Sequence, residues 1–140
     1  MKRIVVGVDG SDNARRALDM ALTIAAKFGA GVTLAYAVPP VPVVGEPTLV
    51  NLVEIQRQQE EYGKQLLSEL EVAKKAGAVP VTTQLLLGPA AESLTDLAER
   101  EQADMVVIGS RGRNAVARVL LGSVSTRLIH VCKRPVLIVH

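Results

Sequence analysis

The sequence predicts an α/β fold in three layers, with helices on both faces of a doubly wound, five-stranded parallel sheet. First, apolar segments of strand length alternate with longer segments of helical periodicity along the chain. Second, residues 4–8 and 105–108 are apolar at consecutive positions, which is typical of strands buried on both faces of a parallel sheet. Third, 140 residues suffice for one continuous core, so we expect residues 1–140 to form a single domain.

The first strand and helix are predicted from the opening residues. Residues 3–8 form the strand, and the Asp-Gly-Ser-Asp turn at residues 9–12 supplies side chains that cap a helix. The helix continues to Phe28 because Ala and Leu recur at helical spacing. Gly29 and Gly31 are expected to end it.

The second strand, at residues 32–38, leads into a segment with four prolines, residues 39–47. Proline excludes this segment from helix interiors and central strands, so we expect an extended loop. This loop is either a flap over a site, a partner contact or a simple surface crossover. Residues 49–76 then form a long helix with one apolar face and one charged face, in which Gly63 is a weak point.

The C-terminal half continues the alternation. The remaining elements are strands at residues 79–87, 105–108 and 136–139 and helices at residues 89–102 and 121–132. Pro89 suits the first turn of a helix. Lys133 and Arg134 place positive charge near the negative end of the last helix, and Pro135 prevents its continuation.

Composition excludes several function classes. A net charge of +2 gives no strong attraction to nucleic acid or to an anionic membrane. Aromatic residues are 2% with no Trp, so the stacking platforms of single-strand binders are missing. We therefore expect no nucleic-acid partner and no membrane partner. No apolar run reaches the roughly 18 residues of a transmembrane helix, and no signal peptide precedes the first strand, so a cytoplasmic location is expected.

Two glycine segments follow the fourth predicted strand. Gly109 and Gly112 frame a turn with two arginines, and Gly122-Ser123 opens the last helix nine residues later. Such loops and helix starts present free backbone N–H groups, and the helix dipole favours an anion there. Together these residues predict a phosphate-binding site, here called the cradle, although glycines are also common in ordinary turns. It matches neither a P-loop nor a G-x-G-x-x-G dinucleotide fingerprint.

Gly109-x-x-Gly112, then nine residues and Gly122-Ser123, resembles the G-x2-G-x9-G-[ST] nucleotide motif of the universal stress protein family, in its ATP-binding subgroup. The opening residues 4–11 and the closing residues 134–139 are similar to that family too, so the resemblance covers essentially the whole chain. It implies a Rossmann-like sheet with strand order 3-2-1-4-5. Strands one and four then lie side by side, and the turn at Asp9 faces the glycine loop across one crevice at the topological switch point.

The resemblance also implies the ligand, which is ATP, with ADP or AMP as alternatives. By position, Gly7, Val8 and Asp9 line the base and ribose side, and Ala37 or Val38 lies against adenine. On the phosphate and ribose side, the candidate residues are Gly109, Ser110, Arg111, Gly112, Arg113, Asn114, Gly122, Ser123, Val124 and Ser125.

Three of the base-side candidates also have a structural interpretation. Asp9 is a candidate contact for nucleotide-bound Mg²⁺, and it equally suits a turn and helix cap. Ala37 and Val38 equally suit the core. No dedicated metal site is visible, because His130 and His140 share no ligand spacing.

We therefore predict an ATP-binding stress-response regulatory protein whose nucleotide is coupled to a dimer or partner state. No residue near the loop is clearly suited to orient water, so binding without efficient turnover fits better. A slow ATPase or phosphotransferase using the same crevice is one alternative, and a nucleotide-free scaffold is another. Alanine at Gly109 or Gly122 is expected to abolish nucleotide retention while the fold survives. Val136–Val139 forms an apolar edge strand, which predicts a homodimer by antiparallel pairing. Other protein partners are not indicated.

Overall fold

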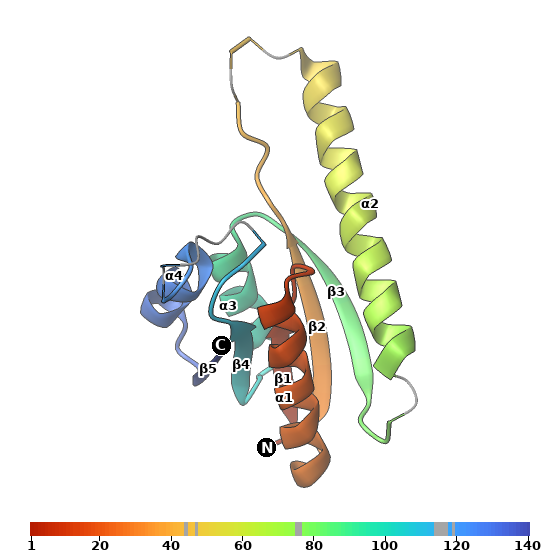
Figure 1. Cartoon of the computed structure of the whole chain (residues 1–140), viewed down its shortest axis with the longest axis vertical. Helices are drawn as coiled ribbons and strands as arrows, with labels where there is room; N and C mark the ends of the chain where they lie inside the picture. The colour runs from red at the N-terminus through yellow and green to blue at the C-terminus, as the bar shows by residue number, and fades with distance from the viewer. Residues whose placement is uncertain (44, 47, 75–76, 114–117, 119) are drawn as a thin grey trace.

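The computed structural model of the chain describes residues 1–43, 45–46, 48–74, 77–113, 118 and 120–140. Its elements are β1 (Arg3–Gly7), α1 (Asp12–Phe28), β2 (Gly31–Val38), α2 (Leu49–Lys74), β3 (Val81–Leu87), α3 (Ala90–Arg100), β4 (Met105–Gly109), α4 (Ser123–Val131) and β5 (Val136–Val139). Within these residues, five parallel strands form one sheet in the order β3-β2-β1-β4-β5 (Figure 1). The predicted doubly wound fold and its strand order are confirmed.

Side chains alternate along each strand between two cores, one on each face of the sheet. Ile4 and Val6 of β1 are fully buried in the core under α1 and α2. Val5 between them is fully buried on the opposite face, in the core under α3 and α4. This double burial explains why β1 and its neighbour β4 are apolar at consecutive positions.

Helix α1 has the ends that its sequence predicts. The Ser11 hydroxyl accepts a hydrogen bond from the Ala14 N–H at 3.2 Å and so caps the first turn. Gly29 ends the helix in the left-handed conformation, with φ of 65°, and its N–H donates to the Ala25 carbonyl. The Ser11 cap joins the turn after β1 to the start of α1, and Gly29 ends the helix before β2 begins.

Three predicted positions differ in detail. Gly31 is the first residue of β2 rather than part of the helix end, because it pairs with β1. Pro89 is the N-cap of α3 rather than a residue of its first turn. Helix α4 begins at Ser123 rather than at residue 121, because the Gly122 N–H is bonded to the Ser110 carbonyl.

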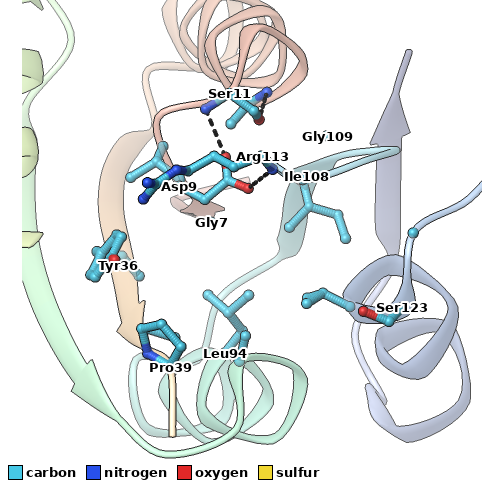
Figure 2. Close-up of a pocket in the computed structure, with 18 of the residues that line it drawn as sticks. Gly7, Asp9, Ser11, Tyr36, Pro39, Leu94, Ile108, Gly109, Arg113 and Ser123 are labelled. Atoms are coloured by element: carbon cyan, nitrogen blue, oxygen red, sulfur yellow. Dashed lines mark hydrogen bonds between the residues drawn. The ribbon is translucent and has the colours of Figure 1, made fainter. Parts of the chain in front are cut away.

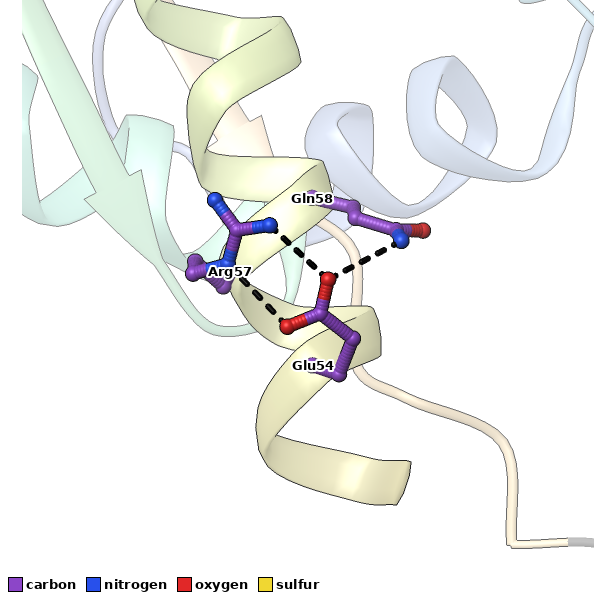
Figure 3. Close-up of polar contacts among 3 residues, drawn as sticks. All are labelled: Glu54, Arg57 and Gln58. Carbon is purple, nitrogen blue, oxygen red and sulfur yellow. Dashed lines mark hydrogen bonds and ion pairs between the residues drawn. The ribbon is translucent and has the colours of Figure 1, made fainter. Parts of the chain in front are cut away.

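Helix α2 packs against β2 and β3 through its C-terminal half, whereas its N-terminal half extends beyond the sheet (Figure 1). On this extension Glu54 accepts hydrogen bonds from Arg57 and Gln58, on the Oε1 atom at 2.8 and 3.2 Å (Figure 3). These hydrogen bonds hold the pKa of the Glu54 carboxyl below its ordinary value.

No helix of the described residues is long and apolar enough to cross a membrane.

Candidate functional site

A cavity of about 820 Å³ lies where the carboxyl ends of β1, β2 and β4 meet. Because β1 and β4 are neighbours whose connections leave toward opposite faces, this is the switch point at which doubly wound sheets bind ligands. Figure 2 shows Asp9, Arg113, Tyr36, Leu94 and Ser123 arranged around this space. Helix α2 adds a wall, because residues of its N-terminal half also line the cavity.

The Asp9 carboxylate joins two segments that are 104 positions apart in sequence. Its Oδ1 accepts a hydrogen bond from the Ser11 N–H at 2.9 Å, which closes the turn into α1. Its Oδ2 accepts one from the Arg113 N–H at 3.2 Å, which ties the glycine loop to that turn (Figure 2). Asp9 therefore has the structural role of a turn residue and at the same time lines the cavity.

The Ser110 carbonyl joins the glycine loop to the start of α4. It accepts from the Gly122 N–H at 2.6 Å and from the Ser125 hydroxyl at 2.9 Å. A Cβ placed on Gly122 would lie 3.7 Å from the Gly112 nitrogen, so the two glycine segments are in contact. The structure thus brings together the two halves of the predicted cradle.

Helix α4 begins without a cap. Its N-cap residue, Gly122, supplies no side-chain acceptor, unlike Ser11 at the start of α1. The first bond of the helix is donated by the Thr126 N–H, so the N–H groups of Ser123 and Val124 have no acceptor within the described residues. These two amides and the positive end of the helix dipole border the cavity, which is an arrangement suited to an anion.

Charges near this end favour the same kind of ligand. Arg111 and Arg113 line the cavity, and among its described lining residues Asp9 is the one carboxylate. The described residues contain no group of three or more His, Cys, Asp or Glu side chains placed to hold a metal. A single carboxylate does suit Mg²⁺ that arrives with a polyphosphate and keeps several of its waters. Both Asp9 oxygens already accept one hydrogen bond, and each retains a further lone pair for such an ion.

The other end of the cavity is aromatic and apolar. The rings of Tyr36 and Tyr62 meet edge to face with centroids 5.8 Å apart. The guanidinium of Arg113 lies 4.5 Å from the centre of the Tyr62 ring, so the glycine loop also contacts α2. Burial raises the pKa of Tyr36, and the positive charge of Arg113 opposes this shift in part, so the phenol is neutral at physiological pH.

Most of the residues predicted from the sequence line the cavity. They are Gly7, Val8, Asp9, Ala37, Gly109, Ser110, Arg111, Gly112, Arg113, Gly122, Ser123, Val124 and Ser125. Val38 does not: it is a core residue, because the alternation along β2 turns its side chain toward α1 and α2. Asn114 lies outside the described residues.

Two of the predicted serines are bonded within the protein. The Ser110 side chain is fully buried, and its hydroxyl accepts from Asn13 Nδ2 at 3.0 Å. The Ser125 hydroxyl is buried, and its single O–H is shared between the carbonyls of Ser110 and Gly122 at 2.9 and 3.0 Å. Of the three serines in the cradle, Ser123 is the exposed one and the one placed to meet a ligand.

Sequence reasoning missed the wall of the cavity that α2 supplies. The lining residues that the sequence did not predict include Ile55, Gln58, Gln59 and Tyr62 from α2, and also Leu94 from α3. Pro39 and Pro40 also line the cavity, which agrees with one of the roles considered for the proline-rich loop. The signal that was available is the spacing of three, four and seven positions among Ile55, Gln59 and Tyr62, which places them on one helix face.

Comparisons with known proteins agree with this architecture. The model of the universal stress protein family matches residues 1–140. A universal stress protein of Methanocaldococcus jannaschii is 35% identical over 138 residues, which cover 99% of this chain and 81% of that protein. A solved universal stress protein in complex with cAMP is 33% identical, with a TM-score of 0.72 and coverage of 99% and 97%. Universal stress protein UspA from Lactobacillus plantarum, 23% identical, has the same fold, with a TM-score of 0.90 and the same coverage. The chain belongs to the universal stress protein family.

Proposed function

We propose that this chain binds an adenine nucleotide, ATP, in the cavity at the switch point and acts as a nucleotide-dependent regulator in the stress response. The observation that carries the proposal is the uncapped start of α4 held against the glycine loop by the Ser110 carbonyl. A relative with 33% identity is a complex with cAMP, which supports an adenine nucleotide as the ligand class.

In this proposal the phosphates lie at the glycine end of the cavity. The N–H groups of Ser123 and Val124 and the Ser123 hydroxyl donate to phosphate oxygens. Arg111 and Arg113 supply positive charge beside them. Mg²⁺ bound to the phosphates would be held by Asp9, and it would neutralise phosphate charge. The base then lies at the opposite end, beside Ala37 and the two tyrosines.

Binding without efficient turnover fits the described lining near the glycine loop, where Asp9 is the one carboxylate and is assigned to the Mg²⁺ rather than to a water molecule. Turnover is kept as an alternative because two glutamines of α2, Gln58 and Gln59, line the same cavity. A regulator needs no turnover. Nucleotide at about 100 times its Kd stabilises the folded state by about 2.7 kcal/mol, which can select one assembly state over another.

The assembly that we propose is a homodimer through β5. This strand pairs with β4 on one side and forms the edge of the sheet on the other. Its four residues, Val136–Val139, are apolar and only half-buried. Unprotected apolar edges tend to pair, and antiparallel pairing with the same strand of a second copy gives a two-fold interface.

Incubation with labelled ATP followed by gel filtration tests the proposed function. Retention of intact ATP by the protein supports regulation by binding. Catalytic conversion to ADP supports the slow ATPase or phosphotransferase instead. The absence of both retention and turnover contradicts the proposal and supports a nucleotide-free scaffold.

A further inference from the structure

One polar atom in the cavity wall lacks a partner. The Oε1 atom of Gln59, on α2, is buried and accepts no hydrogen bond within the described residues. Gln59 lines the cavity from α2. A buried carbonyl oxygen without a donor is unfavourable, so such an atom is usually satisfied by a bound molecule or marks a binding position.

The other glutamines of α2 behave differently. Gln56, Gln58 and Gln65 each donate a side-chain hydrogen bond to a glutamate four positions away, at 3.0, 3.2 and 3.1 Å. Figure 3 shows this contact for Gln58 and Glu54. The positions four residues from Gln59 are Ile55 and Gly63, which offer no such partner. The bonded atom of those three side chains is the amide nitrogen, whereas Gln59 is distinguished by an amide oxygen that is buried without a hydrogen bond.

The surroundings of Gln59 suit a flat heterocycle. Ile55 and Tyr62 lie on the same helix face as Gln59 and line the cavity with it. Tyr36 and Pro39 extend this apolar and aromatic surface from the end of β2. This surface would pack against the face of an aromatic ring, whereas the Gln59 amide would form hydrogen bonds with polar atoms at the edge of that ring.

The amide oxygen accepts, so it requires an N–H donor at the edge of the base. Adenine carries an exocyclic amine at C6, and a Gln amide pairs with this amine and the adjacent N7 in a bidentate manner. Guanine and hypoxanthine carry a carbonyl oxygen at the same position, which would face the Gln59 oxygen with no hydrogen between them. We propose that Gln59 selects adenine over 6-oxopurines, with its Oε1 accepting from the exocyclic amine. This inference rests on the proposed function, in which a nucleotide occupies the cavity.

Affinities of ATP and ITP for the full chain, measured by calorimetry, test the inference, because ITP has a carbonyl in place of the amine. We expect wild type to prefer ATP by about tenfold to 100-fold. In Gln59→Met, which keeps the length of the side chain, this ratio should fall to about threefold or less, since a thioether is a weak acceptor. Gln56→Met is the matched control and should keep the wild-type ratio, because Gln56 lies outside the cavity lining and its amide is bonded to Glu60.

Four outcomes contradict the inference. Equal affinity of wild type for ATP and ITP overturns it. A Gln59→Met variant that keeps the preference also overturns it, and so does a Gln56→Met variant that loses the preference as fully as Gln59→Met. In these three cases ATP binding itself leaves the proposed function standing. Failure of wild type to bind either nucleotide overturns both.

A second measurement needs no variant and applies if Gln59→Met does not fold. Purine riboside triphosphate has a hydrogen atom at C6, so it lacks the donor without adding bulk. Weaker binding of this analogue than of ATP by wild type supports the inference, and equal binding overturns it.

Discussion

The backbone N–H of Arg113 donates a 3.2 Å hydrogen bond to Asp9 Oδ2, and this contact closes the turn after β1 onto the loop after β4. The guanidinium of the same arginine lies over the Tyr62 ring, so one residue of the loop contacts both the turn after β1 and α2. Three segments that are distant in sequence are thereby held around one cavity. Changes at Asp9 should therefore affect both the loop and any ion that accompanies the ligand.

Asp9→Asn should remove the effect of Mg²⁺ on ATP affinity. The amide keeps an oxygen that can accept from Ser11 or Arg113, but it lacks the negative charge that attracts a hard cation. Calorimetric titration of ATP with and without Mg²⁺ measures this. Asp12→Asn, an exposed change of the same charge outside the cavity lining, is the control. If Mg²⁺ strengthens ATP binding equally in wild type and Asp9→Asn, Asp9 is not the metal contact.

Alanine at Gly122 should fold and lose ATP affinity by about tenfold or more. The new methyl group would meet the Arg111 Cα at 3.4 Å and the Gly112 nitrogen at 3.7 Å, so the protein tolerates it while the cradle loses space. Equilibrium dialysis and circular dichroism measure the two properties. Wild-type affinity in a folded Gly122→Ala protein would contradict the cradle.

The structure corrects the expectation for Gly109, where an alanine is unsuited to test the cradle. A Cβ at this position would lie 2.8 Å from the backbone carbon of Asn13 and 2.9 Å from the Ala14 nitrogen, both in α1. Backbone atoms of a capped helix cannot move as a side chain does. Destabilisation of about 1–3 kcal/mol or more is therefore expected, and a loss of binding would report on the fold.

Much of this site could be predicted because its signals are local. The apolar strands, the turn at Asp9 and the glycines at residues 109, 112 and 122 are each evident in short segments. A parallel sheet then places the carboxyl ends of β1 and β4 at one edge, whatever their separation in sequence. Ala37 lines the cavity whereas Val38 lies in the core. Because both residues are apolar, the sequence does not show which of the two faces the cavity.

The contribution of α2 could not be predicted in the same way. Which turn of this helix faces the cavity depends on how closely the helix approaches β2 and β3. Gly63 sets that distance: it is buried, and a Cβ there would lie 2.7 Å from Tyr36 Cε1 and 2.8 Å from Leu85 Cδ1. The sequence showed only a glycine in a helix, which is weak by propensity, whereas its role in packing is a long-range property.

Gly63→Ala should therefore destabilise the protein, although alanine is the better helix former. The gain in helix propensity is about 0.5–1 kcal/mol. The overlap with the Tyr36 ring and Leu85 costs about 1–3 kcal/mol, and a ring has little freedom to yield. Urea denaturation should show a lower free energy of unfolding than wild type. A more stable variant would mean that α2 does not approach the sheet this closely.

Asp104 should make stability depend on pH in the acidic range. Its Oδ2 accepts from the Arg3 and Lys2 N–H groups at 2.9 and 2.6 Å, and these bonds lower the pKa of its carboxyl below the ordinary value. The stabilisation is therefore present above the pKa of the unfolded chain and is lost as the pH falls through the pKa of the folded state. Wild type should be more stable than Asp104→Asn at neutral pH, and the difference should shrink on acidification. A difference that does not change with pH would contradict this account.

Nuclear magnetic resonance of the backbone amides tests the central claim most directly, by comparing saturating ATP with saturating adenosine. The account predicts that the N–H signals of Ser123 and Val124 shift strongly with ATP and little with adenosine, because these amides meet phosphate. The Gly29 amide, bonded at the far end of α1, should shift with neither ligand. Equal shifts with both ligands, or no shift at Ser123 and Val124 with ATP bound, would contradict the account.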